Sequence, residues 1–136
     1  MFNGIIKNTG VVKEIKKSSK SMEISVDSNL RVKKNMLGSS ISCNGVCLTL
    51  IKKKKNSLTF YLSKETINRS NFSKVKTGQI INMEKSLKFG DEVSGHYTQG
   101  HIDTIGKVLS VKIVDKTWII KIKTLSYFNK YIIEKA

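Results

Sequence analysis

The sequence has no proline, one alanine and two cysteines among its 136 residues. Cys43 and Cys47 lack a second cysteine pair or a nearby histidine, so the sequence predicts neither a disulfide scaffold nor a metal site. No apolar run reaches the roughly 20 residues of a membrane span, and the first residues lack the charged-then-apolar pattern of a secretion signal. We therefore expect a cytoplasmic protein with no metal and no membrane partner.

Acidic residues are also scarce, with 10 Asp and Glu against 25 Lys and Arg and a formal net charge of +15. Such a charge is compatible with a nucleic-acid partner. However, only Arg31 and Arg69 are arginine, the residue that best makes bidentate contacts with phosphate and guanine. Scarce alanine and proline beside abundant lysine, isoleucine and asparagine are typical of an AT-rich coding sequence. We interpret the charge as compositional drift and expect no nucleic-acid partner.

Short β-branched segments separated by polar turns dominate the first part of the chain. Strands are predicted over 10–15, 22–26, 40–43, 46–51, 58–62 and 80–84, with one or two helical turns over 63–70. Asn44-Gly45 is a strong hairpin signal because both residues tolerate positive φ. The lysine block 52–55, followed by Asn56, predicts a hairpin tip. Six short strands and one small helix predict an all-β fold, a six-stranded antiparallel Greek-key barrel.

The strand pattern begins again after a loop rich in glycine and charge at 89–95. Segments 105–111 and 118–123 predict a second hairpin around Asp115-Lys116, and 127–133 predict a short amphipathic helix. These elements match the first strands and a short helix of a second barrel that is incomplete.

Two stretches of the chain are alike at a fixed separation. Asn3-Gly4-Ile5-Ile6 precedes Gly10 by six residues, as Gln99-Gly100-His101-Ile102 precedes Gly106, an offset of 100 minus 4, or 96 residues. This indicates an internal repeat, although a chance similarity of two strand openings would look the same. A second Asn-Gly turn would fall near 44 plus 96, or 140, so we expect a first domain over 1–96 and an incomplete second domain over 97–136. The chain is then a truncated product, a fragment, or one that another chain completes.

Five short motifs follow one another along the whole chain. They are MFNGII at 1–6, SCNGVCLT at 42–49, KET at 64–66, VKxGxxINxE at 75–84 and GHYTQGHI at 95–102. Each is weak alone, but five in this order and with this spacing are specific. Together they resemble riboflavin synthase of the trimeric, tandem-barrel type.

The resemblance implies two similar six-stranded barrels followed by a C-terminal helix, and a transferase reaction. In this reaction two 6,7-dimethyl-8-ribityllumazine molecules dismutate to riboflavin and 5-amino-6-ribitylaminopyrimidinedione. No metal or redox cofactor is implied, because the 7-methyl group of the lumazine is a carbon acid whose anion is delocalised into the heterocycle. The protein then has to hold two rings face to face and assist proton transfer and nucleophilic attack.

The resemblance also assigns residues by their place in the motifs. Catalytic roles are implied for Ser40, Cys47 and His101. Contacts to substrate in the first barrel are implied for Phe2, Gly4, Ile5, Ile6, Cys47, Leu48, Thr49, Tyr61, Leu62, Ser63, Lys64, Glu65 and Thr66. The lumazine site of the second barrel is implied to use Gly100, His101, Ile102 and Lys135.

Several of these residues have an ordinary structural interpretation as well. Without the resemblance, Gly4 is a strand kink, Cys47 a buried structural thiol and Glu65 an acid that complements a helix dipole. His101 alone is a surface histidine or a core histidine with satisfied hydrogen bonds. These alternatives stay open at the level of sequence.

In the family that the chain resembles, the site lies between the first barrel of one subunit and the second barrel of its neighbour in a homotrimer. We expect this chain to bind a lumazine or flavin in its first barrel, with negligible turnover unless the missing part is supplied. A non-catalytic lumazine- or flavin-carrying protein of the same fold is an alternative. A nucleic-acid-binding small barrel is another, but the aromatic residues are scattered among apolar positions and do not resemble a stacking platform.

Overall fold

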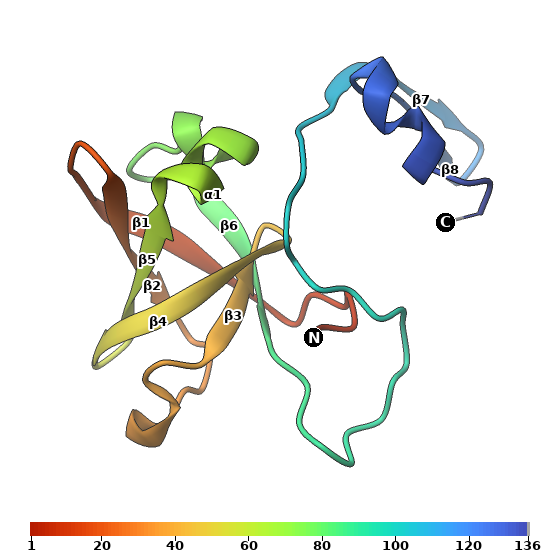
Figure 1. The fold of residues 1–136 in the computed structure, drawn as a ribbon. Coiled ribbons are helices and arrows are strands. Elements are labelled where there is room, and N and C mark those ends of the chain that lie inside the picture. The colour runs from red at the N-terminus through yellow and green to blue at the C-terminus, as the bar shows by residue number, and fades with distance from the viewer. Residues whose placement is uncertain (136) are drawn as a thin grey trace. The chain divides into compact units, whose positions relative to one another are not determined.

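The computed structural model describes residues 1–135, and its two compact units divide between Ile102 and Asp103. The first unit holds a closed six-stranded barrel, and the second holds a two-stranded hairpin with a 3-10 helix (Figure 1). The predicted all-β fold, a six-stranded barrel followed by two further strands and a short helix, is confirmed. Within the described residues, no helix is long and apolar enough to cross a membrane.

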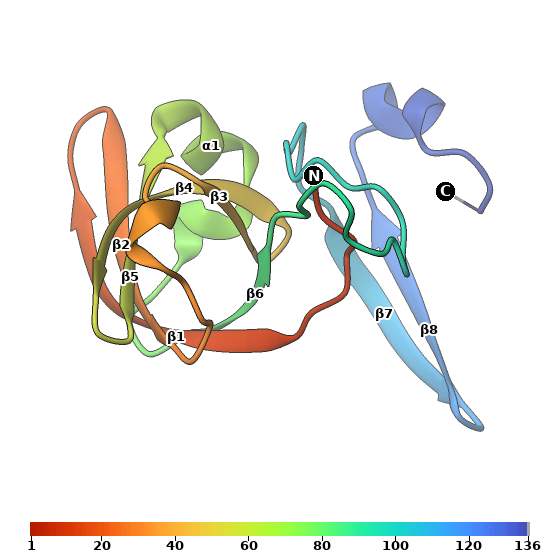
Figure 2. The ribbon, with the colours of Figure 1, turned by 90° about the horizontal axis from the view of Figure 1, so that it is seen from below.

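The barrel consists of six antiparallel strands in the order β1-β2-β5-β4-β3-β6 (Figures 1 and 2). They are β1 (Asn8–Lys17), β2 (Ser21–Ser28), β3 (Ser40–Cys43), β4 (Val46–Lys54), β5 (Ser57–Ser63) and β6 (Ile80–Lys85). Pairing of β6 with β1, from Asn8 opposite Met83 to Val11 opposite Ile80, closes the sheet. Closure leaves no strand with an unpaired edge along its whole length.

The turns form where the sequence supplies residues that accept a left-handed backbone. Asn44 and Gly45 have φ values of 48° and 83° and join β3 to β4. Positive φ at both central residues matches the right-handed twist of the two strands, so the predicted hairpin is confirmed. At the lysine tip between β4 and β5, Lys55 has a φ of 50°.

Alternating side chains fill the inside of the barrel. In β2, Met22, Ile24 and Val26 are at most 2% exposed, while the residues between them are half-buried. Such alternation sends every second side chain into the core. The short helix α1 (Lys64–Arg69) and the 3-10 helix η2 (Asn71–Lys74) lie at one end of the barrel, where Ile67 and Phe72 contact the core (Figure 1). A further 3-10 helix, η1 (Lys34–Met36), lies between β2 and β3.

The second unit comprises β7 (Lys107–Val114), β8 (Thr117–Lys123) and the 3-10 helix η3 (Ser126–Tyr131). The tail is therefore helical as predicted, in the tighter 3-10 form. Its hairpin has the register of the first hairpin shifted by 96 residues: Val12 lies opposite Val26 in β1–β2, and Val108 lies opposite Ile122 in β7–β8. A register shift follows each of these two pairs at the corresponding place.

Candidate functional site

Three predicted site residues, Ser40 of β3, Thr49 of β4 and Tyr61 of β5, lie side by side on the outer wall of the barrel. Thr49 is opposite Ser40 of β3 on one side and opposite Tyr61 of β5 on the other. Their neighbours along the strands, including Leu48 and Leu50, point into the filled core. Because the interior is packed, a ligand can be held only on the outside, where Thr49 and Tyr61 are exposed and Ser40 is half-buried.

A segment distant in sequence completes this part of the wall. The main-chain N–H of Cys47 donates to the carbonyl oxygen of Gly100 at 2.8 Å. Gly100 has a φ of 75°, and a Cβ at this position would lie 2.9 Å from the Cys47 nitrogen and 3.1 Å from the Gly45 oxygen. Only glycine permits so close an approach together with this backbone conformation. His101, which is exposed, and Ile102, which packs against the core, therefore belong to the first unit.

The N-terminal residues lie next to the same segment. Phe2 is 1% exposed, and its main chain pairs with that of Thr98 through two hydrogen bonds of 2.8 and 3.0 Å. Gly4 also has a φ of 75°, but a Cβ there would meet no atom within 4 Å. Ile5 and Ile6 are 37% and 40% exposed. Of the two glycines 96 positions apart, Gly100 is therefore the one that contacts Cys47.

The two thiols differ in their surroundings. Cys43 is fully buried, and this burial, with a smaller effect of neighbouring Cys47, raises the pKa of the Cys43 thiol far above its usual range. Cys47 is half-buried on the outer wall. Cys47 is thus the thiol that a ligand can reach. Among residues 1–135, no group of three or more His, Cys, Asp or Glu side chains could hold a metal ion.

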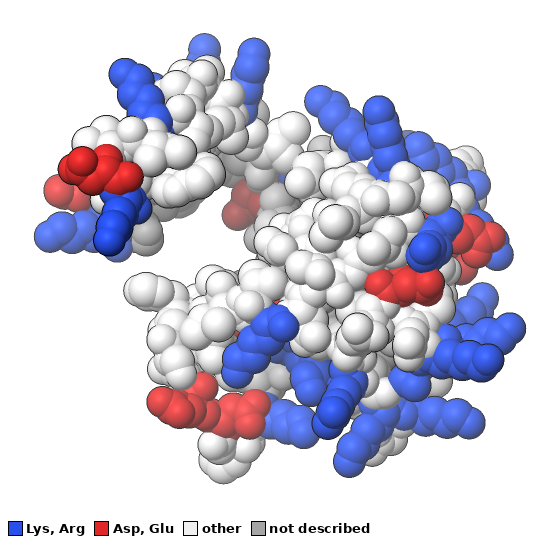
Figure 3. All heavy atoms as spheres, turned by 180° about the vertical axis from the view of Figure 1, so that it is seen from behind, with Lys and Arg blue, Asp and Glu red and all other residues white. Residues whose placement is uncertain are grey.

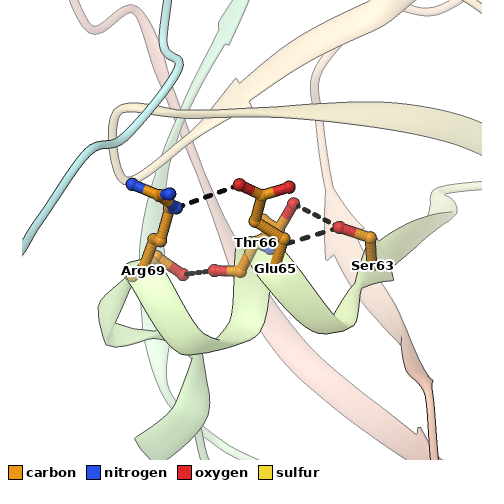
Figure 4. Close-up of polar contacts among 5 residues, drawn as sticks. Ser63, Glu65, Thr66 and Arg69 are labelled. Atoms are coloured by element: carbon orange, nitrogen blue, oxygen red, sulfur yellow. Dashed lines mark hydrogen bonds and ion pairs between the residues drawn. The ribbon is translucent and has the colours of Figure 1, made fainter.

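Helix α1 begins with a side-chain cap at the end of β5. Ser63 Oγ accepts from the Thr66 main-chain N–H at 3.1 Å and lies 3.0 Å from Thr66 Oγ1 (Figure 4). Glu65 Oε1 lies 3.0 Å from Arg69 Nε one turn further on (Figure 4). The cap holds the hydroxyls of Ser63 and Thr66 together near the Tyr61 end of the wall. Lys64 is exposed and lines a separate cleft of about 200 Å³.

Other predicted residues lie in the core, in a separate cleft or in the second unit. Leu48 and Leu62 are 2% and 0% exposed and belong to the core, which leaves only their main chains for contact. Lys135 is an exposed residue of the second unit with a φ of 60°. Ile5 lines a cleft of about 410 Å³ together with Asn3 and Glu84.

Two residues of the first unit that the sequence analysis did not single out make a long-range contact. The main-chain N–H of Asn3 donates to Glu84 Oε1 at 2.7 Å, across 81 residues of sequence. Each residue belongs to one of the five sequence motifs: Asn3 to MFNGII at 1–6, and Glu84 to VKxGxxINxE at 75–84. Their presence in those motifs is the signal that could have identified them.

This chain is similar to known proteins in both sequence and fold. Among protein-family models, the lumazine binding domain matches residues 3–86. A riboflavin synthase of Buchnera aphidicola subsp. Baizongia pistaciae (strain Bp) is 40% identical over 140 residues, which cover the whole of this chain and 65% of the relative. A riboflavin synthase of Photobacterium phosphoreum is 35% identical over 137 residues, covering the whole chain and 63% of the relative. The chain thus spans less than two thirds of the length of these curated relatives.

Solved structures of the same fold include those of LumP. LumP complexed with riboflavin superposes with a TM-score of 0.79 at 22% identity, covering 97% of this chain and 72% of LumP. LumP complexed with 6,7-dimethyl-8-(1'-D-ribityl) lumazine gives a TM-score of 0.77 at 22% identity, covering 93% and 70%. At this level of identity the likeness shows the fold.

Proposed function

Since the chain belongs to the lumazine-binding domain family, we propose that its barrel binds one molecule of 6,7-dimethyl-8-ribityllumazine on the outer wall beside Cys47. We further propose that the chain takes part in the riboflavin synthase reaction, as its relatives do by name. In that reaction one lumazine transfers a four-carbon unit to a second one, which gives riboflavin and 5-amino-6-ribitylaminopyrimidinedione.

The observation that carries the proposal is the hydrogen bond between the Cys47 N–H and the Gly100 carbonyl. It brings residues 47–49 and 100–102 to one place on the wall, although they are distant in sequence. Each of these stretches is one of the motifs that resemble riboflavin synthase. Two independent motifs meeting through the main chain support a shared ligand site.

The proposed roles follow from side-chain chemistry on this wall. The hydroxyls of Ser40 and Thr49 can donate to or accept from the pyrimidine edge of the ring. The Cys47 thiol is a soft, polarizable group beside the heterocycle. The exposed imidazole of His101 can accept the proton that leaves the 7-methyl group of the lumazine.

Helix α1 is proposed to receive the ribityl chain. The hydroxyls of Ser63 and Thr66 lie 3.0 Å apart at its start and offer paired hydrogen-bonding groups to a polyol. Tyr61 presents an exposed ring between this point and Thr49. We also propose that the side chains of Ile5, Ile6 and Lys135 contact ligand in an oligomer, in which a second barrel holds the other lumazine.

The assignment of 97–136 as the opening of a second lumazine-binding barrel is part of this proposal. The matching registers of β1–β2 and β7–β8, shifted by 96 residues, support it. A homotrimer, as the resemblance implies, would bring a second lumazine beside the first. The catalytic step needs two lumazines, so turnover depends on that assembly, whereas binding of one lumazine depends on the first unit alone.

The test is a fluorescence titration of 6,7-dimethyl-8-ribityllumazine with the purified chain. Thr49→Val is expected to weaken binding about tenfold, because it removes a hydroxyl bonded to the ligand. Thr59→Val is the matched control, since Thr59 lies on the same outer wall but bonds to Ser25 at 3.1 Å. Equal affinity of both variants and the unaltered chain for the lumazine would show that the ligand does not bind on this wall.

Absorbance at the riboflavin band then separates an enzyme from a non-catalytic carrier of the same fold. Formation of riboflavin from lumazine by an assembly that contains this chain supports the enzyme, and its loss in His101→Ala supports the proposed role of that residue. Binding without riboflavin under any assembly would favour the carrier.

A nucleic-acid-binding function has no such support. On the face drawn in Figure 3, Lys and Arg side chains are spread over the surface with acidic side chains among them. The cleft of about 330 Å³ lined by Lys13, Lys16, Lys52 and Lys54 also contains Glu14 and Glu23. Glu14 pairs with Lys16 at 3.3 Å and Glu23 with Lys52 at 3.9 Å, which halves the free positive charge there.

A further inference from the structure

Asn3 joins three parts of the first unit that are remote in sequence. Its main-chain N–H donates to Glu84 Oε1 at 2.7 Å, and its carbonyl accepts from the His96 N–H at 3.2 Å. Its side-chain Nδ2 donates to the carbonyl oxygen of Glu92 at 3.3 Å. One residue thus ties the end of β6 to the loop that leads into residues 96–102.

The loop passes so close to Asn3 that its sequence is restricted. A Cβ on Gly95 would lie 2.3 Å from the carbonyl oxygen of Asn3. No other residue type can occupy this position without moving one of the two backbones. Three residues further on, Thr98 pairs with Phe2, and two residues after that Gly100 bonds to Cys47. Three successive contacts, with Asn3, Phe2 and Cys47, therefore hold residues 95–100 against the outer wall of the barrel.

Glu84, which accepts the hydrogen bond from Asn3, lies two strands away from Cys47 in the barrel sheet. Glu84 of β6 is opposite Ser42 of β3, and Ser42 is opposite Cys47 of β4. Two strand spacings therefore separate Glu84 from Cys47, or about 10 Å. Ser42 between them is 4% exposed although its strand neighbours Ile41 and Cys43 point into the core. Both faces of β3 are thus covered at this point.

We propose that Glu84 and Asn3 are positioning residues of the lumazine site, which hold residues 96–102 so that Gly100 to Ile102 face Cys47. The inference rests on the proposed function for its ligand, and on the hydrogen bonds of Asn3 and Gly100 for the way the segment is held. The hydrogen bond to Asn3 is charge-assisted, because a carboxylate accepts it, and such bonds are stronger than neutral ones. Holding the segment in place before the ligand arrives lowers the ordering cost of binding.

Amide hydrogen exchange by NMR tests the positioning without any ligand. In Glu84→Ala the acceptor of the Asn3 N–H is gone, and we expect the Cys47 amide to exchange about tenfold faster because Gly100 leaves it. The amides of Ile24 and Phe60 in the core should keep their protection, which excludes general unfolding. Glu84→Gln retains an oxygen acceptor and should restore slow exchange at Cys47.

Two further variants keep the test decisive. Gly95→Ala perturbs the same contact from the loop side and should also speed exchange at Cys47, even if Glu84→Ala does not fold. Glu23→Ala is the matched control, since Glu23 is a carboxylate on the outer wall that pairs only with Lys52 at 3.9 Å in the described contacts. It should leave exchange at Cys47 unchanged.

Lumazine titration of the same variants separates this inference from the proposed function. The inference expects affinity to fall about tenfold in Glu84→Ala and Gly95→Ala and to recover in Glu84→Gln. Unchanged exchange at Cys47 in both Glu84→Ala and Gly95→Ala overturns the positioning role. Absence of lumazine binding by the unaltered chain overturns the proposed function, while the exchange results still decide whether Glu84 holds the segment.

Discussion

Two hairpins of this chain share one register but differ in what covers them. Val12, Ile24 and Val26 of β1–β2 are fully buried. Their counterparts 96 positions later in β7–β8, Val108, Ile120 and Ile122, are 55%, 52% and 57% exposed. At these three positions the side chain is apolar in both hairpins. Burial therefore depends on the strands that close around a hairpin. Strands β3 to β6 surround the first one, whereas no further strand among the described residues of the second unit covers the other.

The same comparison explains why the second unit lacks a buried hydrophobic core of its own. An isolated two-stranded hairpin is marginally stable in water because one of its faces has no partner. The face of β7–β8 made by Val108, Val111, Ile113, Trp118, Ile120 and Ile122 stays open in the described residues. Exposed apolar faces of this kind promote association.

The largest expected difference is between matched truncations in the two hairpins. Ile24→Ala should lower the free energy of unfolding of the barrel by about 2 to 5 kcal/mol, because it opens a cavity in a filled core. Ile120→Ala, at the corresponding position, should change it by less than about 0.5 kcal/mol. Urea unfolding of the barrel followed by far-UV circular dichroism would measure both. Similar losses in the two variants would show that the second hairpin is covered after all.

A second contrast lies within the β3–β4 hairpin, between an inward and an outward thiol. The raised pKa of Cys43 keeps its thiol protonated at neutral and mildly alkaline pH, and burial denies access to reagents. Alkylation by iodoacetamide in the folded chain should therefore modify Cys47 at least about a hundredfold faster than Cys43. Mass spectrometry of the peptides gives the two rates. In urea the two rates should converge, which serves as the control.

The third contrast concerns the two glycines with equal φ. Gly100→Ala should weaken lumazine binding about tenfold, since its Cβ would meet the Cys47 main chain and displace the segment. Gly4→Ala carries the same backbone strain without a steric clash, and should leave affinity within about twofold. Fluorescence titration measures both. Equal weakening would mean that strain alone, and not contact with Cys47, sets the affinity.

The smallest expected effect separates two helices, α1 after the β4–β5 hairpin and η3 after the β7–β8 hairpin. Ser63→Ala should cost about 1 kcal/mol of barrel stability, because it removes the acceptor for the Thr66 N–H. The residue at the same place before η3, Leu125, makes no side-chain cap. Leu125→Ala should therefore show no capping loss in the same unfolding measurement. A loss for Leu125→Ala equal to that for Ser63→Ala would indicate packing at Leu125 instead.

Local elements could be predicted from the sequence because their causes are local. Asn44-Gly45 makes its turn from the φ preferences of two adjacent residues, and alternation in 22–26 needs only the period of a strand. Closure of the barrel could also be predicted, because closing six short strands into a barrel removes the exposed edges of the sheet. The tail at 127–133 was expected to be helical from its pattern, but a pattern does not distinguish α from 3-10 hydrogen bonding.

The contacts that build the candidate site could not be predicted in this way. The bond from Cys47 to Gly100 joins main-chain atoms 53 residues apart, and main-chain groups leave no side-chain pattern to read. The same is true of the Asn3 N–H on Glu84. The resemblance assigned His101 to the lumazine site of a second barrel, and the offset of 96 residues aligned it with Ile5; in the structure its segment is grouped with the first compact unit. Offsets align equivalent positions but do not tell which partner each position meets.

Phe2 and Thr98 are separated by 96 residues, the same number that relates the two hairpins, and each donates a main-chain N–H to the other. In a symmetric homodimer, a residue on the two-fold axis bonds in this way to its own copy in the other subunit. In a homodimer, every substitution near such an axis appears on both sides at once. In one chain the two sides are encoded separately, so Gly100 can be held against Cys47 while Gly4 stays free to evolve a different role.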